Sequence, residues 1–195
     1  MTRGVLAAAA MVLGGCSVIE PASYPEAPPW QIEDEPIDRV SSFALRTDRG
    51  TALVLRVGAA EIMGPDVNLG RFIEAEGVAI RGRAFGRPVS LDVGAEGVTG
   101  LFDSRPVSLA VESHDGALHF NGLVGGEMSS FAIGPRFAEG MIGRCSYELS
   151  RTDLGYEGRR SCGGATARVW LRIPTALERW GDQERAAVLA ILLSR

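Results

Sequence analysis

The chain has 195 residues, a formal net charge of −4 at pH 7 and 46% hydrophobic residues. This length and composition predict one globular domain with a sizeable apolar core. The slight excess of acidic residues gives no electrostatic case for binding nucleic acid, so we expect no nucleic-acid partner.

Residues 1–15 have the pattern of a signal peptide. One positive charge, at Arg3, precedes an apolar stretch from Val5 to Leu13. A run of this length is too short to cross a bilayer as a helix, which takes about 20 residues. It fits the apolar centre of a secretory signal peptide.

The next residue, Cys16, completes a motif. Leu13-Gly14-Gly15-Cys16 resembles the lipobox of bacterial lipoproteins. The resemblance implies that residues 1–15 are removed, that the Cys16 thiol receives a diacylglyceryl group, and that acyl chains such as palmitate anchor the new amino terminus. Several chains are needed for stable attachment, because one alone binds only marginally. An ordinary secretory signal with a chance cysteine is the alternative.

The residue after the cysteine bears on location. Ser17 stands where inner-membrane retention signals of this family carry Asp. The resemblance therefore implies a lipid-anchored protein of the cell envelope, at the outer membrane.

Residues 16–40 form an acidic, proline-rich segment. Between Glu20 and Asp38 there are five prolines and six acidic residues. Proline favours extended, polyproline-like chain, so we expect a semi-rigid tether that could hold a domain roughly 60 Å from the lipid at about 3.1 Å per residue. Docking of Trp30 on the domain is the alternative.

Residues 41–173 alternate apolar with polar or small side chains, which is the period of half-buried strands. Residues 87–93 (RPVSLDV) recur as residues 105–111 (RPVSLAV), with six of seven residues identical at an offset of 18. The centre of this repeat returns at Ser42-Phe-Ala-Leu45, Ser130-Phe-Ala-Ile133 and Ser146-Tyr-Glu-Leu149. We expect a repeated unit of strand, turn of four to six residues and strand, with large apolar side chains on the core face and serines outward.

The expected fold class is mainly β: an antiparallel meander of hairpins that forms a sandwich or barrel, with a C-terminal helix. The segments Ala95-Glu-Gly97, His114-Asp-Gly116 and Ala138-Glu-Gly140 supply glycines for tight turns. Gly-x-x-Gly repeats such as that at Gly97 fall on strands, where glycine marks bulges or bends. A parallel β-solenoid with repeats of about 20 residues is the alternative.

Cys145 and Cys162 remain as a pair once Cys16 is lipidated, which predicts a disulfide in an exported domain. Pairing residues whose numbers sum to 307 sets these cysteines opposite each other, Tyr147 opposite Arg160 and Arg151 opposite Tyr156. The bond would staple the last hairpin. A two-residue loop at 153–154 lacks the favoured turn residues, so a longer loop with the same centre is the alternative.

Residues 174–195 differ in kind, because their apolar residues recur near helical spacing. Thr175-Ala-Leu-Glu178 has the form of a capping box, and Gly181-Asp182 would kink or split the segment, with Asp182 as a second cap. Residues 186–193 are all apolar. We expect this helical segment to pack over one end of the sheet; an exposed partner-binding helix is the alternative.

A group of arginines and tyrosines around the stapled hairpin is the candidate binding site. This composition is typical of binding hot spots, and the alternative is a solvated edge whose charges discourage aggregation. The candidate residues are Arg144, Tyr147, Arg151, Tyr156, Arg159 and Arg160. The stretch RCSYELSRTDLGYEGRRSCGG resembles the small all-β lipoprotein domains of bacterial envelopes, which include lysozyme-inhibitor barrels and META-type domains; the resemblance assigns no functional residue.

Nothing in the sequence predicts a catalytic centre, a metal or a cofactor. His114 and His119 flank Asp115, but a turn at Asp115-Gly116 is expected to leave the two histidines on opposite faces. Glu74 and Glu76 share one strand face, as in any solvated strand.

The predicted function is therefore that of a non-enzymatic, lipid-anchored envelope lipoprotein whose β-domain binds another envelope component, protein or glycan. A lipocalin-like carrier of a small apolar ligand is the alternative. A hydrolase of envelope polymers is less favoured.

Overall fold

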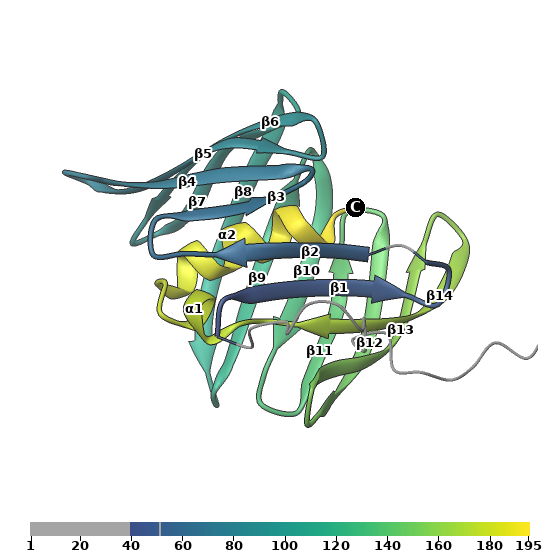
Figure 1. Ribbon diagram of the computed structural model, residues 1–195. Helices are drawn as coiled ribbons and strands as arrows, with labels where there is room; N and C mark the ends of the chain where they lie inside the picture. The colour runs from purple at the N-terminus through teal and green to yellow at the C-terminus, as the bar shows by residue number, and fades with distance from the viewer. Residues whose placement is uncertain (1–39, 51) are drawn as a thin grey trace, which may run out of the picture.

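The computed structural model describes residues 40–50 and 52–195, which form a closed antiparallel barrel of fourteen strands with two C-terminal helices. Each strand pairs with its neighbours in the chain, and β1 pairs with β14 to close the barrel (Figure 1). The expected signal peptide, Cys16 and most of the acidic segment lie outside the described residues. The antiparallel meander is confirmed, the barrel is the form that it takes, and the solenoid alternative is wrong.

The elements follow each other with short connections. They are β1 (Ser42–Thr47), β2 (Ala52–Val57), β3 (Glu61–Gly64), β4 (Val67–Glu74), β5 (Gly77–Ala84), β6 (Arg87–Gly94), β7 (Gly97–Phe102), β8 (Arg105–His114), β9 (Ala117–Val124), β10 (Glu127–Ile133), β11 (Phe137–Ile142), β12 (Cys145–Thr152), β13 (Gly155–Cys162), β14 (Ala165–Arg172), α1 (Thr175–Glu178) and α2 (Asp182–Leu193).

The repeated motif forms strands β6 and β8, and its alternation sets which side chains face the core. In β6, Val89, Leu91 and Val93 are buried, whereas Ser90 between them is exposed. Because successive side chains of a strand point to opposite faces, the apolar set lies inside the barrel and the serines lie outside. This expectation is confirmed.

The hairpin turns are tighter than expected, since most connect their strands through two residues. Asp115 and Gly116, with φ of 53° and 73°, have the positive φ values of the hairpin turn that Asp-Gly favours. The expected turn at Ala138-Glu-Gly140 is wrong: these residues lie within β11, and the preceding connection is at residues 134–136. Two-residue turns with positive φ match the right-handed twist of paired strands, whereas type I or II turns would splay the strands.

Glycines inside alternate strands let the barrel walls bend. At Gly122 in β9, φ is +144° and an added Cβ would overlap the carbonyl oxygen of Ser108 on β8. Equivalent close approaches to the neighbouring strand occur at Gly82, Gly100, Gly140 and Gly158. A large inward side chain lies opposite each of these glycines on the neighbouring strand. Leu109 of β8, for example, pairs with Gly122 of β9 and is buried. The role expected for strand glycines, as sites of bending, fits this geometry.

Helix α2 lies inside the barrel, not over one end of the sheet as expected. In Figure 1 it lies behind β2 and β3, and it packs against β5, β6, β7, β8 and β9. Every residue from Ala186 to Leu193 is at most 2% exposed, so no face of this part of the helix contacts solvent. A barrel of about eight strands can be filled by its own side chains, and barrel width grows with strand number. Fourteen strands leave additional interior space, and a helix that is apolar all round fills it.

Polar contacts fix both ends of α2. At its start, Ser113 Oγ donates to the carboxylate of Asp182, and Arg71 donates two hydrogen bonds to Glu184, of 2.5 and 2.9 Å. The Glu184 carboxylate is largely buried, and Arg71 supplies it with a charged hydrogen-bond donor. At its end, the Tyr147 hydroxyl donates to the Leu193 carbonyl oxygen. The helix is therefore joined to β4, β8 and β12.

The split into two helices at Gly181 is confirmed, but the expected caps are not. Neither helix has a side-chain N-cap hydrogen bond, and the residues at the N-cap positions are Pro174 and Gly181. Asp182 is instead the first residue of α2, where its carboxylate accepts from Ser113 and Arg185. The hydrogen bond from Ser113 is the main cause of the lowered pKa of Asp182. Neither helix of the described part of the chain is long and apolar enough to cross a membrane.

Candidate functional site

The stapled hairpin forms with the register expected from the sequence. β12 and β13 pair with Cys145 opposite Cys162, Tyr147 opposite Arg160, and Arg151 opposite Tyr156. The two cysteines form a disulfide with their Cα atoms 4.2 Å apart. The strands are joined by the two residues 153–154, so the longer-loop alternative is wrong.

The two tyrosines of the hairpin point into the barrel. Tyr147 is 3% exposed and its ring packs edge-on against Phe131, with 5.8 Å between ring centroids. Tyr156 is 5% exposed, and its hydroxyl donates to the Gly134 carbonyl oxygen at 3.0 Å. Both tyrosines therefore hold the interior together and are not available to a partner at the surface.

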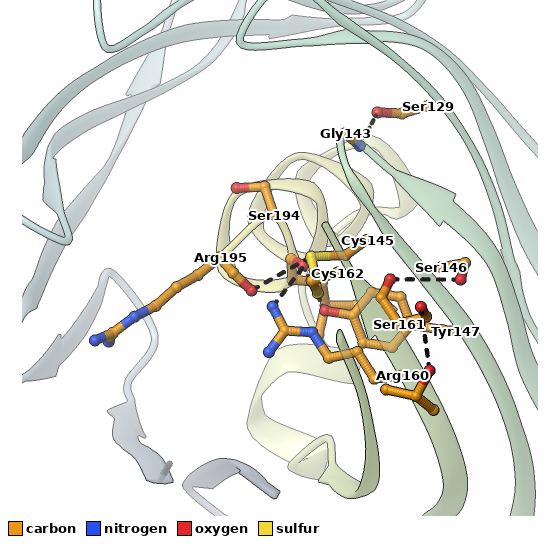
Figure 2. Close-up of a disulfide and its surroundings, with 12 residues drawn as sticks. Ser129, Gly143, Cys145, Ser146, Tyr147, Arg160, Ser161, Cys162, Ser194 and Arg195 are labelled. Atoms are coloured by element: carbon orange, nitrogen blue, oxygen red, sulfur yellow. Dashed lines mark hydrogen bonds between the residues drawn. A yellow bond between two sulfur atoms is a disulfide. The ribbon is translucent and has the colours of Figure 1, made fainter. Parts of the chain in front are cut away.

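The arginines of the hairpin lie in three different places. The Arg160 guanidinium lies 5.5 Å from the Tyr147 ring centroid and donates to Cys145 Sγ at 3.2 Å (Figure 2). Arg151 lies similarly over Tyr156, at 4.8 Å. Arg159 is on the outer face, in an exposed ion pair with Glu148 at 2.8 Å. The six candidate residues therefore do not form one continuous surface.

Tyr147 gives the hairpin a predicted response to alkaline pH. Burial raises the pKa of Tyr147 to about 12, and the nearby Arg160 acts in the opposite direction. The pKa of Tyr147 is higher in the folded chain than in the unfolded chain. The protonated hydroxyl therefore contributes stability that is fully present below about pH 10. We expect it to fall by about 1 kcal/mol per pH unit as the pH rises from about 10 to 12. Urea unfolding at a series of pH values checks this, and a Tyr147→Phe variant with the same alkaline loss as the parent would contradict it.

The sixth candidate residue, Arg144, lies at a hollow in the mouth of the barrel. This cavity has a volume of about 480 Å³ and lies beside the end of α2. Its charged lining consists of Arg87, Arg105, Arg144, Arg195, Asp103 and Glu127. The apolar floor includes Phe85 and Phe102. Arg144 therefore lies near arginines from other parts of the barrel, and it does not share a site with Tyr147 and Tyr156.

The electrostatics of this arginine-lined mouth favour an anion. Four guanidinium groups face two carboxylates in the lining. Arg87 lies 3.6 Å from Asp103, and Arg195 lies 3.7 Å from Asp66. Arg105 and Arg144 are exposed and form no ion pair with any residue in the described part of the chain. Guanidinium groups bind carboxylates, phosphates and sulfates through paired hydrogen bonds.

The sequence contains a signal for this mouth that the prediction missed. Arg87 and Arg105 are the first residues of the two copies of the repeated heptad, and they begin β6 and β8. An offset of 18 residues corresponds to one complete hairpin, so both arginines return to the same end of the barrel. The repeat could therefore have placed them together.

The two histidines are close together, contrary to expectation. His114 belongs to β8 and not to the loop, so its ring stacks on that of His119, with centroids 4.1 Å apart and planes 6° from parallel. The stacked arrangement does not direct both rings toward a common ligand. Within residues 40–50 and 52–195, no three His, Cys, Asp or Glu side chains are grouped so as to hold a metal ion.

Comparisons with protein-family models, curated proteins and solved structures give no match for this chain.

Proposed function

We propose that this chain is a lipid-anchored envelope lipoprotein whose non-enzymatic β-domain binds an anionic envelope component, protein or glycan, at the arginine-lined mouth of the barrel. The observation that carries the proposal is the mouth itself, where Arg105 and Arg144 are exposed beside a cavity of about 480 Å³. Two guanidinium groups without a described carboxylate partner are suited to a carboxylate, phosphate or sulfate.

The filled interior supports binding at the surface. Helix α2 occupies the space in which a lipocalin-like carrier would hold an apolar ligand. This favours the surface-binding proposal over a carrier. The lipobox resemblance at Cys16 and a disulfide between Cys145 and Cys162 both suit an exported protein, because disulfides persist in oxidising compartments.

The test is photo-crosslinking in intact envelopes of the host. A photoreactive phenylalanine analogue replaces Phe85, which is partly exposed and lines the cavity. We expect a crosslinked component in the parent, and at least a tenfold loss when Arg105→Ser and Arg144→Ser are combined. Arg159→Ser is the matched control, since it removes an exposed arginine from the outer face. Crosslinks that persist in the double variant, or that fail to form in the parent, would overturn the proposal.

A further inference from the structure

Strands β1 and β14 depart from the alternation that holds elsewhere in the barrel. The outward residues of strands such as β6 are exposed, but β1 is buried from Phe43 to Thr47 and β14 from Val169 to Arg172. Leu45 and Leu171 belong to the core inside the barrel. The residues that alternate with the inward ones along β1 and β14 face outward and are nevertheless buried. Strands buried on both faces need a layer on each side.

The outward residues form a compact basic and aromatic face. Cross-strand pairing sets Ala44 beside Arg172 and Arg46 beside Trp170. Their exposed fractions are only 1% for Ala44, 4% for Arg46, and 9% for each of Trp170 and Arg172. The guanidinium of the nearby Arg168 lies 5.1 Å from the Trp170 ring centroid. We refer to Ala44, Arg46, Trp170 and Arg172 as the β1–β14 outer face.

The described elements do not supply a second layer over this face. β1 makes extensive contacts only with its sheet neighbours β2 and β14, which lie on either side of it (Figure 1). The clearest sign that an acceptor is missing is Arg46, because its Nε and Nη2 atoms are buried without a hydrogen-bond partner. A buried guanidinium is costly unless an anion or other acceptor contacts it. The face therefore fits a partner that is both acidic and apolar.

The chain itself carries such a partner immediately before β1. Val40 and Ser41 are fixed beside the start of β1, through hydrogen bonds from Ala176 N to the Val40 carbonyl oxygen and from Val57 N to the Ser41 carbonyl oxygen. The preceding residues 30–38 have the sequence WQIEDEPID, with four carboxylates and three large apolar side chains. Six strand residues extend about 20 Å, and nine residues of extended chain span about 28 Å. The segment is therefore long enough to cross the face.

We propose that residues 30–38 dock on the β1–β14 outer face, with carboxylates of the segment contacting Arg46 and Arg172 and its apolar side chains packing on Trp170. β1 is paired on both sides, so the segment binds through side chains and not as an additional strand. Docking shortens the free tether to residues 16–29, or about 43 Å at most. It also fixes which side of the barrel faces the point of attachment. This proposal does not depend on the arginine-lined mouth or on the identity of its ligand.

Limited proteolysis of the chain, purified as the host processes it, tests the docking. A protease that cleaves after glutamate has one usable target inside the segment, at Glu33, because Glu35 precedes Pro36, and an internal reference before the segment, at Glu26. We expect cleavage at Glu33 to be at least tenfold slower than at Glu26. Arg46→Glu should remove this protection, whereas Arg159→Glu on the outer face of β13 should retain it.

Charge reversal in the segment guards against a simple loss of folding in Arg46→Glu. Replacing Asp38 by arginine leaves the barrel and the bond between Glu33 and Asp34 unchanged, and should expose Glu33 as strongly as Arg46→Glu does. Combining this change with Arg46→Glu should restore protection at least in part. Equal cleavage rates at Glu26 and Glu33 in the parent would overturn the proposal. Protection that increases with protein concentration would also overturn it, because the segment would then dock on a second copy.

Discussion

Replacing Ile191 by alanine is expected to lower the free energy of unfolding by about 3–5 kcal/mol, because the side chain is 1% exposed within a helix that the barrel encloses. The substitution removes apolar contacts and leaves a cavity that the surrounding strands cannot collapse to fill. Strands and helix should unfold in one transition, since α2 forms the centre of the core. Urea unfolding monitored by far-ultraviolet circular dichroism gives the measurement.

Ile73→Ala is the matched control for this prediction. The side chain of Ile73 is 79% exposed near the end of β4, so the same chemical change should alter stability by less than about 0.5 kcal/mol. Equal effects at the two isoleucines would contradict the placement of α2 inside the barrel. So would a separate early transition of the helix in the parent protein.

Replacing Gly122 by alanine is expected to destabilise the chain by about 3 kcal/mol. The added methyl group would overlap the Ser108 carbonyl oxygen, and the φ of +144° is unfavourable for a residue with a side chain. Since the obstructing atom is backbone, relief requires two paired strands to move apart. Thermal and urea unfolding of the purified variant measure the loss.

Gly94→Ala provides the comparison within the same barrel. An added Cβ at Gly94 meets no atom within 4 Å, and this glycine does not require a left-handed φ. The change should therefore be neutral to within about 0.5 kcal/mol. If Gly122→Ala were equally neutral, the close approach of β8 and β9 at this point would be wrong.

The strands and the stapled hairpin could be predicted because their signals are local. Alternation assigns inward and outward positions within each strand, and a turn centred between Cys145 and Cys162 fixes every pair of that hairpin. Closure of the barrel could not be predicted in the same way. It depends on Ala44 pairing with Arg172, which are far apart in the sequence, and no short-range pattern specifies that contact.

The position of the helix also depends on the whole barrel. Residues 186–193 are apolar on every side, and this pattern predicts burial but not what surrounds the helix. Whether a helix covers a sheet or fills a barrel follows from the number of strands and from closure. Both are properties of the assembled chain.

The candidate binding site shows what register alone leaves undecided. The predicted register pairs Tyr147 with Arg160, and the repeat at Ser146-Tyr-Glu-Leu149 predicts Tyr147 on the core face, so its assignment to a surface site conflicted with the repeat. Leu149 shares a strand face with Tyr147, and its apolar side chain already indicates that this face is the inner one. With that step, the tyrosines would have been assigned to the core, and only Arg144 and Arg159 would have remained as outward candidates.

The measurement that tests the proposed function most directly is the mass of the mature protein recovered from the host envelope, before and after reduction. We expect an amino-terminal peptide that begins at Cys16 and carries fatty acyl chains, together with a mass increase of about two hydrogens when the Cys145–Cys162 bond is reduced. A chain that retains residues 1–15, or an unmodified Cys16 with both remaining thiols already reduced, would contradict a lipid-anchored protein of the envelope.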